Sequence, residues 1–121
     1  MPHIIVEYSD NLSAHVDIQS VVQALYETLC ARQDAEIDPD RVLVRAYETK
    51  HYVLGTQKTA DFLLIIQLLL VKGRSWEMMK SLAADLQEKA REIMADHNIE
   101  ACVTAEPIEL SEGYCSLRYR R

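Results

Sequence analysis

The sequence has little glycine and little proline, three residues of each among 121. Because 49% of its residues are hydrophobic and 26% are charged, the composition is that of an ordered globular chain. Its length suits one compact domain, so residues 1–121 are expected to form a single unit. The three cysteines are widely spaced, and the four histidines show no ligand spacing. These patterns argue against a disulfide framework and predict no metal site.

The chain also lacks a positive charge balance and a long apolar run. Its net charge of -6 argues against a nucleic-acid partner, and the short basic end at 118–121 is interpreted as a solvated tail. The longest apolar run, 62–71, is interrupted by Gln67 and is shorter than the roughly 20 residues that cross a bilayer. Since the first residues also lack the features of a signal peptide, we expect a cytoplasmic protein with no membrane partner.

Hydrophobic spacing predicts alternating strands and helices. Period-two alternation predicts strands at 3–8 and 41–47, and the second strand would place Arg41 and Arg45 on one side. The spacing i, i+3, i+4, i+7 predicts a helix over roughly 14–33, capped by Asp17 or Ser13, and a second helix from Ser75 to about Asn98. The remaining expected segments are a hairpin or excursion at 48–60, a buried central strand at 62–66, a strand at 101–105 ended by Pro107, and a short strand at 114–119.

This order predicts an α/β (α+β) domain made of two βαβ units. Right-handed crossovers would place two antiparallel helices on one face of a four-stranded mixed sheet. The other face would stay uncovered. Because Ile5, Leu43, Leu64 and Ile66 leave apolar groups on both strand faces, we expect the chain to form oligomers.

Two segments of the sequence carry a resemblance to a known family. The opening residues 1–11, MPHIIVEYSDN, are similar to the start of the 5-carboxymethyl-2-hydroxymuconate isomerases. These belong to the tautomerase superfamily, with macrophage migration inhibitory factor and 4-oxalocrotonate tautomerase. The later Lys72-Gly73-Arg74-Ser75 before a helix resembles the same family. The resemblance covers nearly the whole chain and implies a homotrimer.

An N-terminal proline has a chemistry of its own. When Met1 is removed, Pro2 becomes a secondary amine, and a free α-amino group has a pKa of about 8 that burial lowers. Such a nitrogen is a base suited to neutral pH, whereas a retained Met1 would make it an amide. The resemblance implies that Pro2 moves a proton within an unsaturated keto or enol carboxylic acid, without a cofactor.

The resemblance also implies that arginines bind the carboxylates of a small-molecule substrate. Arg74 matches the family arginine before the second helix, and Arg41 matches the one before the second strand. The family has a second arginine near Arg41 that this sequence lacks, so Arg45 is a substitute candidate and the substrate is expected to carry fewer carboxylates. A planar guanidinium suits bidentate carboxylate binding.

Other interpretations stay open at this point. Arg41 and Arg45 could be exposed residues paired with nearby acidic side chains, and Arg74 could belong only to a turn. The chain could be a non-catalytic trimeric binding or scaffold protein of the same fold. It could also carry out another reaction of the superfamily, as a dehalogenase, decarboxylase or hydratase.

Overall fold

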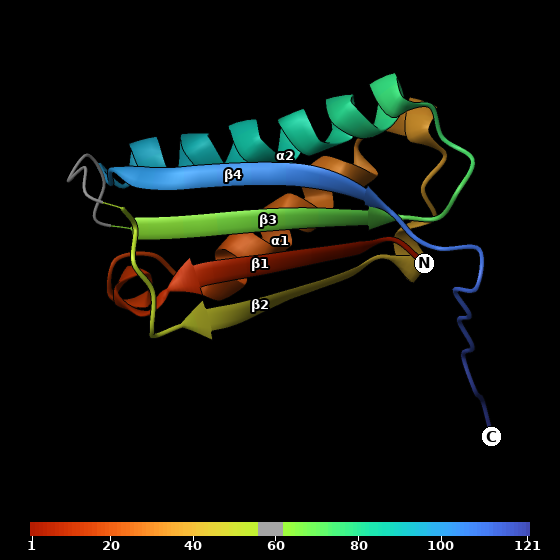
Figure 1. The fold of residues 1–121 in the computed structure, drawn as a ribbon, viewed down its shortest axis with the longest axis horizontal. Coiled ribbons are helices and arrows are strands. Elements are labelled where there is room, and N and C mark those ends of the chain that lie inside the picture. Colours follow the sequence, from red (N-terminus) through yellow and green to blue (C-terminus); the bar gives the residue numbers. More distant parts are fainter. Residues whose placement is uncertain (56–61) are drawn as a thin grey trace.

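The computed structural model describes residues 1–55 and 62–121, and these form one sheet covered by two helices (Figure 1). The sheet has the order β2-β1-β3-β4, with β1 parallel to β2, β3 parallel to β4, and β1 antiparallel to β3. The predicted pair of βαβ units and the mixed sheet are therefore confirmed. In chain order the main elements are β1 His3–Ser9, α1 Ile18–Cys30, β2 Leu43–Thr49, β3 Phe62–Leu70, α2 Trp76–Asp96 and β4 Ala101–Glu109.

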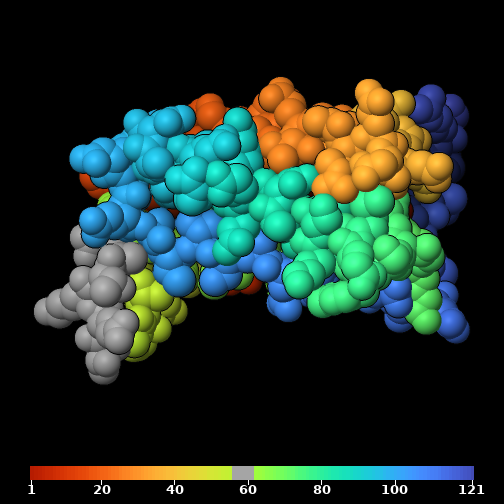
Figure 2. Space-filling model, turned by 90° about the horizontal axis from the view of Figure 1, so that it is seen from above, coloured from red at the N-terminus to blue at the C-terminus, as the bar shows by residue number. Residues whose placement is uncertain are grey.

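The core lies between the sheet and the helices. Alternate residues of β1 and β3 point toward the helices, and their side chains are at most 1% exposed. The helices present apolar stripes to them and pack against each other side by side, as the view from above shows (Figure 2). The buried strand residues are Ile4, Val6, Leu64, Ile66, Leu68 and Leu70, and the buried helix residues include Val21, Leu25, Leu29, Leu82 and Leu86.

The opposite face of the sheet carries no helix (Figure 1). The strand register places Ile5, Leu43 and Ile65 on it, and Leu43 is 42% exposed. Leu64 and Ile66, which were expected to help leave both faces apolar, belong to the closed core instead. The uncovered face is therefore mixed in character, with apolar and charged side chains side by side.

Several predicted boundaries differ from the structure. The first helix begins at Ile18 rather than near residue 14, because 10–14 form a separate 3-10 turn whose Leu12 is buried in the core. Asp17 occupies the N-cap position but accepts a hydrogen bond from Ser20 Oγ (2.6 Å), not from the helix backbone. None of the helices among the described residues is long and apolar enough to span a membrane.

The C-terminal part of the chain shows two further differences. β4 continues through Pro107 to Glu109, because an outer strand has one edge where a missing N–H breaks no hydrogen bond. Residues 114–119, expected as a strand, are an irregular tail. Of the expected excursion at 48–60, β2 takes the first two residues, and 56–60 lie outside the described residues.

Candidate active site at the amino end of β1

Pro2 lies at the start of β1, where the chain enters the sheet. Its ring is buried, and its carbonyl accepts a hydrogen bond from the Leu43 N–H (3.0 Å). This bond extends the parallel ladder of β1 and β2 by one residue beyond His3. The sheet therefore fixes the position of Pro2, while the partly buried Met1 precedes it.

A cleft of about 320 Å³ opens beside Met1. One wall is the turn that precedes β2, with Asp38, Asp40 and Arg41, and the other is the tail segment 116–118. Met1 itself lines the cleft, so removal of Met1 would enlarge it. The turn is fixed by its own cap, because the Asp38 carboxylate accepts from the Asp40 N–H (3.0 Å).

The sequence predicted Arg41 in a strand, but the structure places it in this turn. Pro39 starts a short 3-10 helix, Pro39–Arg41, so that β2 begins only at Leu43. The turn thereby carries the exposed Arg41 side chain to the cleft.

The electrostatic field at the chain terminus comes from two of the predicted arginines. Partial desolvation lowers the pKa of the Met1 α-amino group, and the guanidinium charges of Arg41 and Arg74 lower the pKa further. Both cations therefore act on the position from which an N-terminal amine would work. A lowered amine pKa favours the uncharged form that can accept a proton.

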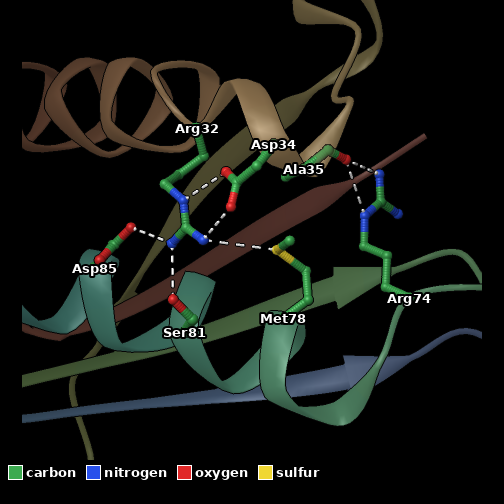
Figure 3. A network of polar contacts seen from close by, with 7 residues as sticks. All are labelled: Arg32, Asp34, Ala35, Arg74, Met78, Ser81 and Asp85. Atoms are coloured by element: carbon green, nitrogen blue, oxygen red, sulfur yellow. Dashed lines mark hydrogen bonds and ion pairs between the residues drawn. The ribbon is translucent and has the colours of Figure 1, made fainter.

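Arg74 stands directly before α2 and is held by backbone. Its Nε and Nη2 both donate to the Ala35 carbonyl, at 3.3 and 3.0 Å (Figure 3). Gly73 precedes it with φ +123°, a conformation that L side chains rarely adopt, and the Ser75 hydroxyl caps α2 by accepting from the Met78 N–H (3.1 Å). The turn 72–75 was predicted to place Arg74 at this helix terminus, and the structure places it there.

The Ala35 carbonyl is in turn positioned by Arg32 (Figure 3). The Arg32 guanidinium donates two hydrogen bonds to the Asp34 carboxylate, at 2.9 and 3.0 Å, and Asp34 belongs to the short 3-10 helix Gln33–Ala35. It also reaches α2, where it donates to Asp85 (2.7 Å), Ser81 (2.9 Å) and the Met78 sulfur (3.7 Å). The segment that holds Arg74 is therefore tied to the same helix that Arg74 precedes.

Arg45 lies elsewhere, on the uncovered face of the sheet. Its Nη1 donates to His3 Nδ1 (3.1 Å), and its Nε donates to the Tyr47 hydroxyl (3.1 Å). Because a guanidinium can only donate, His3 Nδ1 is the acceptor, and the neutral ring carries its proton on Nε2 toward the Tyr114 hydroxyl (3.0 Å). Neither Arg45 nor Arg74 is among the residues that line the cleft at Met1. The structure thus places Arg41 at the cleft, Arg74 before α2 where its charge lowers the pKa of the Met1 amine, and Arg45 in a separate polar cluster.

Desolvation and the Arg45 charge, with a smaller contribution from the N-terminus, lower the pKa of His3 below 6.5. The sequence had suggested no role for His3, Tyr114 or Arg118. The only available indication for Arg118 was the basic end of the chain, which was interpreted as a solvated tail.

The two βαβ units and the arginines around the chain terminus define a class of small α+β proteins, the tautomerase-like isomerases. The chain belongs to the 5-carboxymethyl-2-hydroxymuconate isomerase family, whose model matches residues 2–119. It is accordingly an isomerase, and the predictions of family, fold and enzyme class are confirmed.

Solved structures agree with this assignment. A 5-carboxymethyl-2-hydroxymuconate isomerase from Deinococcus radiodurans R1 is 27% identical, with a TM-score of 0.81 over 98% of this chain and 90% of that one. A 5-carboxymethyl-2-hydroxymuconate delta-isomerase is 20% identical, with a TM-score of 0.83 over 98% and 89%. A fused wild-type 4-OT symmetric trimer shares the fold at 15% identity, with a TM-score of 0.66 over 95% and 90%. No curated protein matches the chain.

Proposed function

We propose that this isomerase moves a proton within an unsaturated keto or enol carboxylic acid, with the Pro2 nitrogen as its base and no cofactor. The observation that carries the proposal is the common position of three groups. Met1 lies at a cleft lined by Arg41, and partial desolvation together with the charges of Arg41 and Arg74 lowers the pKa of the Met1 amine. A base, a space for a small molecule and cations for a carboxylate thus occur together.

The proposed reaction follows from these groups. After Met1 is removed, the uncharged Pro2 nitrogen takes a proton from one carbon of the substrate and returns it to another, so that the double bond shifts without net loss or gain of atoms. Arg41 and Arg74 bind a carboxylate or stabilise the negative charge that develops on the enolate oxygen. A positioned base typically contributes about 10²- to 10⁴-fold to such a rate.

The assembly is part of the same proposal. The uncovered sheet face and the trimeric 4-OT relative support a homotrimer, and small-angle scattering or analytical ultracentrifugation would measure its mass. The substrate proposed for the cleft is a small carboxylate, with 5-carboxymethyl-2-hydroxymuconate as the first candidate because of the family. We place the enzyme in the cytoplasm, which fractionation of the producing cells would test.

The experiment compares chains that differ only at the N-terminus. Intact mass identifies the processed chain, and an ultraviolet assay follows enol-to-keto conversion of 5-carboxymethyl-2-hydroxymuconate. Pro2→Ala should lower kcat about 100-fold or more, and a chain with a peptide extension on Pro2 should be inactive because its nitrogen is an amide. An extended chain that keeps the kcat of the processed enzyme would exclude Pro2 as the base.

The arginines provide a matched pair of variants. Arg41→Gln should raise KM about tenfold, since it removes a charge-assisted contact at the cleft. Arg45→Gln removes the same charge from the His3 cluster and should leave KM within about twofold. Equal effects of the two substitutions would contradict the assignment of Arg41 to the substrate.

A further inference from the structure

The C-terminal tail is anchored across the edge of the sheet where β1 begins and β3 ends. After β4, the Leu110 N–H donates to the Leu70 carbonyl (2.7 Å), and Lys72 forms an ion pair with Glu112 (3.1 Å). The Tyr114 hydroxyl then bonds His3 Nε2, and the two rings meet edge to face with centroids 5.9 Å apart. These contacts direct the tail past the start of β1. The interpretation of the basic end as a solvated tail is therefore incomplete.

Arg118 completes this path at the cleft. Its Nη2 donates to the Asp40 carbonyl (2.7 Å), and Arg118 lines the cleft together with Met1 and Arg41. A guanidinium has five N–H donors, so this bond uses only a part of its capacity and fixes the orientation of the rest. The contact joins residues 78 positions apart in the chain.

The charges of the cleft explain why a second arginine matters there. Asp38 and Asp40 both line it, and their carboxylates oppose the binding of an anion. Arg41 alone offsets one of them, whereas Arg41 and Arg118 together offset both. Arg118 is thus the second cation of the cleft, beside the one that Arg41 supplies for the first carboxylate.

We propose that Arg118, held by the Asp40 carbonyl beside Met1 and Arg41, binds a second carboxylate of the substrate and thereby selects multiply charged substrates. It would take the place of the family arginine that is absent next to Arg41. The inference rests on the proposed function, since it presumes that the substrate reacts at Pro2. It is an alternative to the expectation that the substrate carries fewer carboxylates than those of the family.

The test uses two substrates and matched variants. 5-Carboxymethyl-2-hydroxymuconate is multiply charged, and the enol form of phenylpyruvate carries a single carboxylate. Arg118→Gln should raise KM for the first about tenfold and leave kcat for it and KM for the second within about twofold. Arg118→Lys should restore part of the lost affinity. Arg120→Gln removes an identical charge from the exposed tail and should change neither KM.

A second control separates substrate binding from loss of the tail. Glu112→Gln removes the ion pair with Lys72 but leaves Arg118 in place, so both KM values should stay unchanged. Equal rises for both substrates in Arg118→Gln would mean that the tail had detached, and this result would overturn the inference. An unchanged KM in Arg118→Gln would do so as well. If Pro2→Ala were fully active, the proposed function would fail whatever Arg118 does.

Discussion

Gly73 sets the direction of the chain into Arg74, and its replacement by alanine gives a sharp prediction. Its φ of +123° is a conformation that L side chains rarely adopt. An added Cβ would meet no atom within 4 Å, so the expected effect of Gly73→Ala is backbone strain alone and not a clash. Strain of this kind costs about 1–3 kcal/mol, and the stiffer unfolded chain returns about 0.4–1 kcal/mol. The net loss of stability should be about 1–2 kcal/mol.

The matched control is Gly113→Ala. Gly113 is also in a turn, but it does not have a positive φ, and its added Cβ would lie 3.7 Å from Ser111 Oγ, an ordinary contact. Alanine there should be neutral or slightly stabilising, because only the unfolded state changes. The two variants thus introduce the same methyl group in different backbone conformations.

Urea unfolding at one protein concentration measures the difference. A fixed concentration matters because assembly makes stability depend on it. With a slope of about 1–3 kcal/mol per molar urea, Gly73→Ala should lower the midpoint by about 1 M. If its midpoint equals that of Gly113→Ala, the strain argument is wrong. A variant that relieves its strain by moving the backbone should also displace Arg74 from Ala35 and raise KM.

Two further predictions concern His3 and the helix caps. Because the pKa of His3 is lowered in the folded chain, the unfolded chain binds more protons as pH falls through 6.5, and stability present above that pH should decrease on acidification. His3→Gln should make this decrease smaller in urea titrations between pH 7.5 and 5.5. A pH profile identical to that of the unchanged protein would contradict the role of His3. Ser75→Ala should lower the free energy of unfolding by about 1 kcal/mol, because the Ser75 hydroxyl caps α2. Asp17→Ala should change it by less than about 0.5 kcal/mol, because the Asp17 side chain makes no cap hydrogen bond to α1. Thermal or urea unfolding measures both, and a larger loss for Asp17→Ala would contradict this interpretation.

The sequence was sufficient for the parts of the fold that repeat locally. The alternation in 3–8 predicted β1, and the capping residue Ser75 predicted the start of α2. The turn before Ser75 predicted the position of Arg74 correctly. Arg41 was assigned to a strand because its neighbours alternate, but the ladder of β2 begins at Leu43, opposite His3. An alternating pattern predicts that a segment is extended, but it does not show at which residue the pairing with the neighbouring strand begins.

Long-range contacts could not be predicted in this way. Residues 114–119 have strand-like residues but pair with no strand of the described chain, and they are held by single hydrogen bonds between Tyr114 and His3 and between Arg118 and Asp40. Arg45 shared an expected strand face with Arg41, yet the fold gave it a histidine partner. The helix predicted over roughly 14–33 was overextended at its start, because the 3-10 helix Asp10–Ala14 takes the residues before α1, which begins at Ile18.

Pro107 has a consequence for how copies of the chain meet. It lies in β4, at one end of the strand order, and stays in register with Leu68. Since its nitrogen has no hydrogen to offer along the outer rim, another chain could not continue a hydrogen-bonded ladder past this position. The interruption applies to the β4 rim alone, since the strand at the opposite rim, β2, contains no proline.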